Sequence, residues 1–237
     1  MSETSPPDAA QPVDGQPVAE KDDGAYHHGD LPATLMALAL THIALEGTEK
    51  LSLRALAREA GVSATAPYKH FPTKRCLLAA LATQGFRALG EATSSVDVTG
   101  TDLEDAFVAM GMAYIRFATE NQTAYQIMFG TVIEDFSEYP ELSEAAEQSF
   151  SPVRNLIDLA LARRSGWDMT PELLGGIIWT TVHGMASLLI FAATRLDMDK
   201  ALMRRPNQAL AALIQEQERA LRIQMRGLLM QSETTGG

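Results

Sequence analysis

Apolar residues recur at helical spacing along most of this chain. Between residues 31 and 43 they return every three or four positions, which predicts a helix that begins after Asp30 and ends at Gly47. A short second helix is expected to begin after Ser52, because serine is a good N-cap and leucines and alanines follow at helical spacing. Gly61 is expected to end that second helix.

Ser63 is expected to begin a third helix, which Pro72 ends. Leucines between residues 77 and 89 predict a fourth, longer helix. Further helices are predicted over 102–119, 121–130, 141–164, 171–196 and 206–230. No alternating run of β-branched residues predicts a strand, so the expected fold class is all-α.

The composition changes along the chain and suggests three parts. Residues 1–25 lack large apolar side chains and are rich in acidic residues and proline, which predicts a disordered tail. Residues 26–90 hold the four short helices, and residues 91–237 hold the larger helical body. We therefore expect a small N-terminal domain and a larger C-terminal one.

Charge is distributed unevenly between these parts. The formal net charge is −11, which at first disfavours a nucleic-acid partner. Residues 26–90, however, carry seven Lys and Arg against four Asp and Glu, whereas both flanking parts are acidic. A basic segment in an acidic chain is typical of a local phosphate-binding module, although a small excess of this size also arises from ordinary scatter.

Residues 51–70 match a helix-turn-helix pattern. The turn between two steeply crossed helices needs a residue without a Cβ, here Gly61, followed by an apolar residue that plugs the crossing, here Val62. The second helix of such a motif lies in the major groove of DNA. Many proteins without DNA function also contain two short helices around a glycine, so the pattern alone leaves both interpretations open.

The sequence YKHFPTK at residues 68–74, with the helices on both sides, resembles the signature of the TetR family over roughly residues 26–90. The resemblance implies that Tyr68 and His70 bind phosphates and that Lys74, at the start of the fourth helix, also contacts the DNA backbone. It further suggests DNA contacts from the residues on the two helices of the motif: Arg54, Ser63, Thr65, Ala66 and Lys69. The alternatives are core packing for Tyr68, a structural cap for His70, and solvated side chains for the lysines.

One part of the motif departs from the family pattern. Many members have threonine and a large apolar residue where this chain has Ala66 and Pro67. Pro67 lacks the amide that would bond the Ser63 carbonyl, so the third helix is expected to begin nearer Thr65. Ala66 has no hydrogen-bond donor in its side chain, although its methyl group suits contact with a thymine methyl.

Residues 173–193 contain no Asp, Glu, Lys or Arg over a length that would just cross a bilayer. Hydroxyl and imidazole side chains near the middle of this run and the amphipathic helix that follows argue against a membrane span. A helix that is apolar all round is also expected when one face meets its own core and the other meets a second subunit. We therefore favour a soluble, cytoplasmic protein over one with a single span.

The same apolar run resembles the C-terminal domain of a TetR subgroup named for a Trp–His–Gly pattern, here Trp179, His183 and Gly184. TetR-type proteins dimerise through their last two long helices, which would be about 171–196 and 206–230. The apolar stripe expected at that seam consists of Leu210, Leu213, Ile214, Gln217, Leu221 and Leu228. Gly184 is expected to allow close approach between helices.

Aromatic and methionine side chains of the body suggest an effector site. The residues expected to line a cavity for an apolar or aromatic small molecule are Tyr114, Phe117, Met128, Phe129, Trp179 and His183. The alternative is that His183 is a hydrogen-bonded core residue beside a packed tryptophan. No other potential metal ligand stands at a usable spacing from His27 and His28, so no metal site is expected.

The sequence predicts no catalytic residues and no cofactor, because it contains no phosphate loop, catalytic triad or paired-carboxylate motif, and Cys76 has no evident base partner. The function predicted is a homodimeric repressor that binds a near-palindromic operator in double-stranded DNA and is released by a small molecule. The competing prediction is an all-helical binding protein or enzyme that does not bind DNA.

Overall fold

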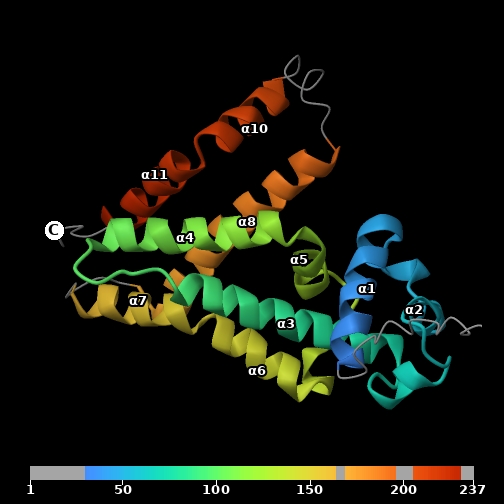
Figure 1. Ribbon diagram of the computed structural model, residues 1–237. Coiled ribbons are helices and arrows are strands. Elements are labelled where there is room, and N and C mark those ends of the chain that lie inside the picture. The colour runs from blue at the N-terminus through green and yellow to red at the C-terminus, as the bar shows by residue number, and fades with distance from the viewer. Residues whose placement is uncertain (1–29, 164–168, 196–204, 231–237) are drawn as a thin grey trace, which may run out of the picture. The chain divides into compact units, whose positions relative to one another are not determined.

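The computed structural model describes residues 30–163, 169–195 and 205–230 of the chain, and from Leu31 onward they form one compact unit. Throughout these ranges every regular element is a helix, so the all-α prediction is confirmed (Figure 1). The predicted tail, residues 1–25, and His27 and His28 lie outside the described residues.

The first helices follow the predicted apolar pattern. Helix α1 covers Leu31–Glu46 and buries Leu35, Ala39 and Ile43. It ends at Gly47, whose φ of 84° lies in the left-handed region that favours glycine. A 3₁₀ turn, η1, covers Thr48–Lys50, and helix α2 covers Leu53–Glu59.

Gly61 makes the sharp turn after α2. Its φ is 69°, and a Cβ built on it would meet no atom within 4 Å. The glycine is therefore required by the backbone conformation rather than by lack of space.

The segment that follows is shorter than the predicted third helix. It is a 3₁₀ turn, η2, over Ala66–Lys69. The Ala66 amide donates to the Ser63 carbonyl at 3.0 Å, which is a three-residue spacing, because Pro67 has no amide to make the four-residue bond. Ser63 therefore does not cap an α-helix as predicted, and its hydroxyl lies 3.2 Å from the hydroxyl of Thr65.

Helix α3, over Lys74–Ser94, is the long fourth helix of the prediction. Its N-cap is Thr73, whose hydroxyl accepts a hydrogen bond from the Cys76 amide at 3.1 Å. Helices α4, over Leu103–Glu120, and α5, over Gln122–Phe129, pack against it.

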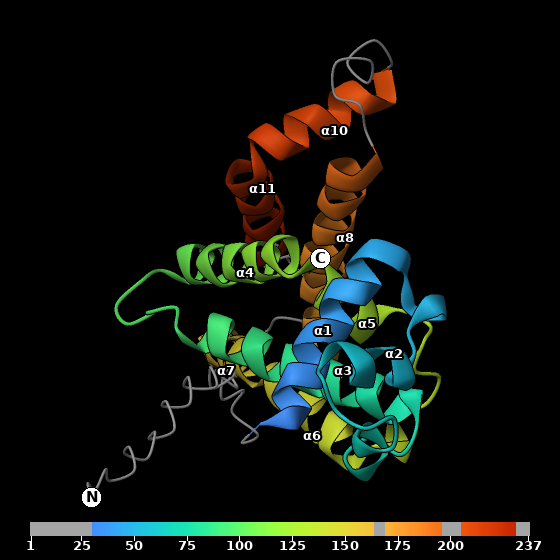
Figure 2. The same cartoon turned by 45° about the vertical axis from the view of Figure 1, so that its right-hand side comes forward.

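The predicted helix 141–164 is broken into two. Helix α6 covers Pro140–Ser149 after a short 3₁₀ turn, η3, over Phe136–Glu138, and helix α7 covers Ser151–Ala162. The break falls at Phe150, two residues before Pro152 in the first turn of α7, as expected where a proline cannot continue the preceding helix. Helix α6 lies along α3 in both views (Figures 1 and 2).

Helix α8 covers Pro171–Arg195 and begins where the sequence predicts, with the Leu173 amide donating to the Thr170 hydroxyl at 3.2 Å. Among the described helices α8 is long and apolar enough over Pro171–Ala193 to cross a membrane, but 44% of its most apolar window is buried. The core helix of a soluble protein meets the same criterion, so this is weak evidence for a span.

The last predicted helix is also broken, into α10 over Arg205–Gln215 and α11 over Gln217–Met230. The side-chain amide of Gln217 donates to the Ile214 carbonyl at 3.0 Å, and a side chain that enters the backbone ladder is a recognised cause of kinks. The bend between α10 and α11 is visible in Figure 2.

Helix α11 is held against the start of α4 by ion pairs. The guanidinium of Arg226 donates to both oxygens of Glu104, at 2.9 and 3.0 Å. Arg222 pairs with Glu104, Asp105 and Glu218. These arginines hold the pKa of Glu104 below its usual value.

Candidate functional site

The residues expected to contact DNA lie on the surface around η2. Arg54, Ser63, Thr65, Lys69 and His70 are exposed. Tyr68 exposes 42% of its surface, which is large for a tyrosine beside an apolar core. Ala66 is partly buried.

The core beneath this surface is formed by the neighbouring side chains. Pro67 and Phe71 are buried on either side of the exposed run and anchor the turn. The turn therefore presents polar groups outward while its apolar residues hold it in place. That is the arrangement required of a DNA-reading element, and DNA contact by these residues remains a prediction.

Lys74 stands at the first position of α3, as the sequence predicts. Its ammonium group donates a hydrogen bond to the Glu49 carbonyl at 3.1 Å, and the residue is partly buried. The lysine is therefore positioned against η1, at the edge of the exposed surface that η2 forms.

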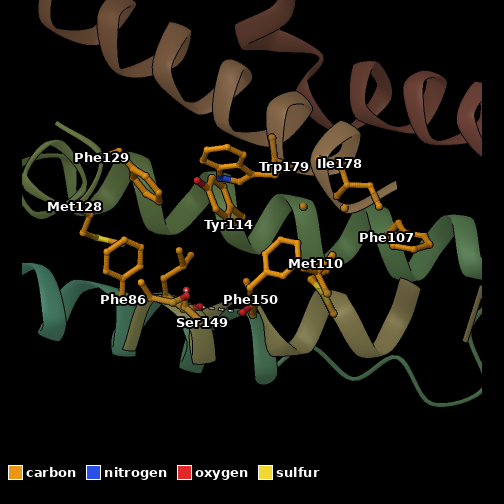
Figure 3. A pocket seen from close by; sticks show the side chains of 18 of the residues that line it. Phe86, Phe107, Met110, Tyr114, Met128, Phe129, Ser149, Phe150, Ile178 and Trp179 are labelled. Carbon is orange, nitrogen blue, oxygen red and sulfur yellow. Dashed lines mark hydrogen bonds between the residues drawn. The ribbon is translucent and has the colours of Figure 1, made fainter. Parts of the chain in front are cut away.

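A partly open cavity of about 480 Å³ lies between α3, α4, α5, α6, α7 and α8 (Figure 3). Its wall is formed mainly by aromatic and aliphatic side chains: Phe86, Leu89, Phe107, Met110, Tyr114, Met128, Phe129, Phe136, Phe150, Val153, Ile178, Trp179 and Val182. The remaining lining residues are small or polar: Thr93, Gly111, Ala146, Ser149, Gly175 and Gly176. A volume and lining of this kind suit a small organic ligand.

Four of the six residues expected at an effector site line this cavity, namely Tyr114, Met128, Phe129 and Trp179. Phe117 does not, because it lies on another face of α4 and borders a separate groove next to α11. His183 does not line the cavity either. It packs behind the wall, with its ring 4.8 Å from that of Phe129 and 5.4 Å from that of Trp179.

His183 forms a hydrogen-bonded cluster with two tyrosines. Its Nδ1 lies 2.6 Å from the Tyr125 hydroxyl and 3.2 Å from the Tyr114 hydroxyl, and the two hydroxyls are 2.9 Å apart. The sequence indicated Tyr114 and His183 but not Tyr125, which stands on α5 and carries no signal of its own.

Burial changes the acidity of all three groups. It raises the pKa of Tyr114 to about 12, an effect that hydrogen bonding with Tyr125 and Trp179 partly offsets. Burial also raises the pKa of Tyr125 well above its usual value and lowers that of His183. The cluster is therefore uncharged near neutral pH.

A second, more open hollow of about 410 Å³ lies next to the cavity. Thr93 and Met110 line both spaces. The far wall of the hollow carries uncharged polar side chains, among them Gln148, Ser151 and Asn155. These two side chains therefore border both spaces.

Helix α3 connects the two candidate sites. Lys74 is its first residue, and Phe86, Leu89 and Thr93 further along the same helix line the cavity. At 1.5 Å per residue, Phe86 stands about 18 Å along the helix from Lys74.

One face of α8 is apolar and exposed. Residues Leu173, Gly176, Thr180, Gly184, Leu188 and Phe191 recur every three or four positions along it, and Leu188 and Phe191 each expose 48% of their surface. A Cβ on Gly184 would meet no atom within 4 Å, so the close approach predicted for this glycine does not occur among the residues that the structure describes. On α11, Ile223 and Met230 are exposed, whereas Leu221 is fully buried in the core.

Within the described residues, no group of three or more His, Cys, Asp and Glu side chains is placed to hold a metal ion. Neither candidate site contains residues that require a metal or a cofactor.

The sequence matches two family models. Residues 35–81 match the model described as bacterial regulatory proteins, tetR family. Residues 107–222 match the model described as tetracyclin repressor-like, C-terminal domain. No curated protein matched the sequence. Neither model describes a catalytic family, and neither is named for the Trp–His–Gly pattern, so that subgroup remains a prediction.

Solved structures share the fold over most of the chain. A Rhodococcus sp. RHA1 protein described as having unknown function is 30% identical, with a TM-score of 0.66 over 86% of this chain and 98% of that one. A putative TetR family regulator from Vibrio parahaemolyticus is 21% identical, with a TM-score of 0.56 over 80% of this chain and 97% of that one. The TetR family regulator PfmR from Thermus thermophilus is 20% identical, with a TM-score of 0.50 over 65% and 84%. At such identities the last two show the fold alone.

Proposed function

We infer what this protein does from one premise: the chain belongs to the TetR family of bacterial transcription regulators. We propose that it is a cytoplasmic, dimeric repressor, not an enzyme, that binds a near-palindromic operator. An apolar or aromatic small molecule that enters the cavity of about 480 Å³ would release it from DNA.

The observation that carries this proposal is the course of α3. Lys74, at one end of the helix, follows η2 in the sequence and hydrogen-bonds to η1, and Phe86 and Leu89 line the cavity further along. A ligand that changes the packing of these side chains would act on α3, the helix that also carries Lys74 at its start. The ligand shifts the equilibrium between the DNA-binding and the released conformation only to the extent that it binds one of them more tightly than the other.

The contacts proposed on DNA follow from exposure and chemistry. Tyr68, His70 and Lys74 would bind phosphates, and Arg54, Thr65 and Lys69 would approach base edges. Ser63 and Ala66 would lie against the groove without supplying a strong donor. Two copies related by a twofold axis would then read two half-sites about one helical turn apart.

The exposed face of α8 supports dimerisation. Gly176, Thr180 and Gly184 are small residues four apart on an uncharged face, which allows another helix to approach closely. Leu188 and Phe191 extend that face with large apolar side chains. A second copy of the same helix, together with α11, would cover them.

Selection of bound fragments from random duplex DNA tests the proposal. The purified protein is expected to enrich one near-palindromic sequence, and its affinity for that sequence is expected to fall steeply as the salt concentration rises. The Lys69→Ala variant should enrich an altered sequence. Failure of the wild-type protein to enrich any sequence would contradict the proposal.

A further inference from the structure

Two hydroxyl groups that line the cavity have already given their protons to neighbours. The Thr93 hydroxyl donates to the Leu89 carbonyl at 3.0 Å and also lies 3.1 Å from the Gly90 carbonyl. The Ser149 hydroxyl donates to the Ala146 carbonyl at 2.7 Å. Each oxygen is therefore left with lone pairs and no free proton on the cavity side.

The hydroxyl of Tyr114 likewise donates its proton to a neighbour within the protein. The contact of 2.6 Å between the Tyr125 hydroxyl and His183 Nδ1 is within the range of O–H donors and shorter than N–H donors usually give, so Tyr125 donates to Nδ1. With that proton used, the Tyr125 oxygen is the acceptor at 2.9 Å, and Tyr114 donates to it. The Tyr114 oxygen consequently offers the cavity an acceptor.

Charge is missing from the wall as well. None of the described residues that line the cavity is Asp, Glu, Lys, Arg or His. The indole N–H of Trp179, the one other side-chain donor among these lining residues, lies beside the Tyr114 oxygen in Figure 3 and hydrogen-bonds to it, so a ligand donor would share that oxygen with Trp179. Trp179 itself is 43% exposed, so it stands at the edge of the cavity.

We propose that the cavity binds an uncharged, mainly hydrophobic molecule that donates a hydroxyl or N–H hydrogen bond to the Tyr114 oxygen, with aromatic hydroxyl compounds as the best-fitting class. A carboxylate would face hydroxyl lone pairs without a cation to pair with, and an ammonium group would lack a carboxylate. The aromatic walls favour a planar ring system through edge and offset contacts. This inference rests on the proposed function only in taking this cavity as the effector site.

Fluorescent pyrene derivatives test the inference on the full-length protein without DNA. The four probes share one ring system and differ in one group: 1-hydroxypyrene, 1-methoxypyrene, 1-pyrenecarboxylate and 1-pyrenemethylammonium. At pH 7 we expect 1-hydroxypyrene to bind about threefold to tenfold more tightly than 1-methoxypyrene, since only the hydroxyl compound donates. The two charged probes should bind more than about a hundredfold more weakly than 1-hydroxypyrene.

Tyr114→Phe removes the proposed acceptor and keeps the ring. In this variant 1-hydroxypyrene and 1-methoxypyrene should bind equally well, and the unchanged affinity for 1-methoxypyrene would show that the cavity is still formed. Tyr139→Phe makes the same chemical change at a tyrosine that does not line the cavity, and it should keep the wild-type preference.

The inference is overturned if either charged probe binds as tightly as 1-hydroxypyrene, if Tyr114→Phe keeps the preference, or if none of the four probes saturates the protein. Operator release by 1-hydroxypyrene is measured separately. Preferential binding without release would count against the proposed effector role and leave the ligand class standing. Loss of DNA binding would count against the proposed function and leave the titration unaffected.

Discussion

At the scale of single residues, Lys74 is fixed in place by the protein before any DNA is bound. Its ammonium group donates one hydrogen bond to the Glu49 carbonyl at 3.1 Å. An ammonium group has three protons, so two remain for a phosphate. In the proposed phosphate contact, the side chain would therefore lose less freedom than a fully solvated lysine.

Replacement of Lys74 by alanine should weaken binding to all DNA sequences by a similar factor and make the dependence of log affinity on log salt shallower by about one. Fluorescence anisotropy with cognate and random duplexes at several salt concentrations measures both effects. The control is Lys50→Ala. Lys50 is an exposed lysine on η1 that pairs with Glu46 on α1, and its replacement should change the salt slope less. An unchanged slope in Lys74→Ala would remove this residue from the phosphate contacts.

His183 should make the fold sensitive to acid. Burial lowers its pKa below the ordinary value of 6.5, so the unfolded chain takes up this proton at a higher pH than the folded one. The stability that this group contributes is therefore present above about pH 6.5 and is lost as the pH falls.

We expect the free energy of unfolding in urea to drop between pH 7.5 and 5, and to drop less in His183→Gln, whose side chain still offers an acceptor to Tyr125. His70→Gln, at an exposed position, is the control and should keep the wild-type drop. Equal drops in wild type and His183→Gln would assign the acid sensitivity to other groups.

At the scale of the elements, Gly111 sets the distance at which α4 meets α8 and α11. A Cβ on this residue would lie 2.6 Å from Leu221 Cδ2 and 3.2 Å from Val182 Cγ1. Leu221 is fully buried, so its side chain has little room to move away.

Gly111→Ala should therefore reduce the free energy of unfolding by about 1–3 kcal/mol through overpacking. Gly227→Ala, on an exposed turn of α11 where a Cβ meets no atom within 4 Å, is the matched control and should be neutral or raise stability by up to about 1 kcal/mol. Urea denaturation of both variants gives the comparison. A stable Gly111→Ala protein would mean that α11 shifts easily along α4.

The helices themselves could be predicted from periodicity, but their breaks could not. The C-terminus of α1 follows from Gly47 and the N-terminus of α8 from Thr170, because each residue acts on the backbone next to it. The break between α6 and α7 coincides with Pro152 in the first turn of α7, and the apolar periodicity over 141–164 runs across it without interruption.

The same limit applies to the cavity. Helical spacing placed Trp179 and His183 on one side of α8. Only Trp179 lines the cavity, whereas the His183 ring lies behind the wall and is hydrogen-bonded to Tyr125. Phe117 shares α4 with Tyr114, but it stands at the margin of that side of the helix and lines another groove, next to α11. The sequence did not single out Phe86 and Phe150 as cavity residues, because a phenylalanine at either position is equally typical of an ordinary core.

At the scale of the whole molecule, one residue of the stripe that the sequence indicated for the seam between two copies is excluded. Leu221 belongs to the core of its own chain, with no exposed surface, and cannot take part in a seam. Exposed apolar side chains on the helices proposed for the seam include Leu188 and Phe191 on α8 and Ile223 and Met230 on α11.

Leu188→Glu should convert dimers to monomers, because it places a charge in the centre of the proposed apolar interface. Leu159→Glu, at a leucine on α7 that is 42% exposed against 48% for Leu188, is the matched control and should remain dimeric. Sedimentation velocity distinguishes the two, and the monomer should bind a full operator more weakly. Dimers in both variants would place the interface elsewhere.

The place of Met110 has an evolutionary consequence. This side chain lines both the cavity of about 480 Å³ and the neighbouring hollow of about 410 Å³, so its replacement by alanine is expected to enlarge the cavity towards the hollow. Loss of the buried methionine costs about 2–5 kcal/mol, which a larger bound molecule would partly restore. In the proposed effector role of the cavity, a single codon would separate a detector of compact compounds from one of elongated compounds, and descendants of this gene could diverge in what they detect while the operator that they recognise stays the same.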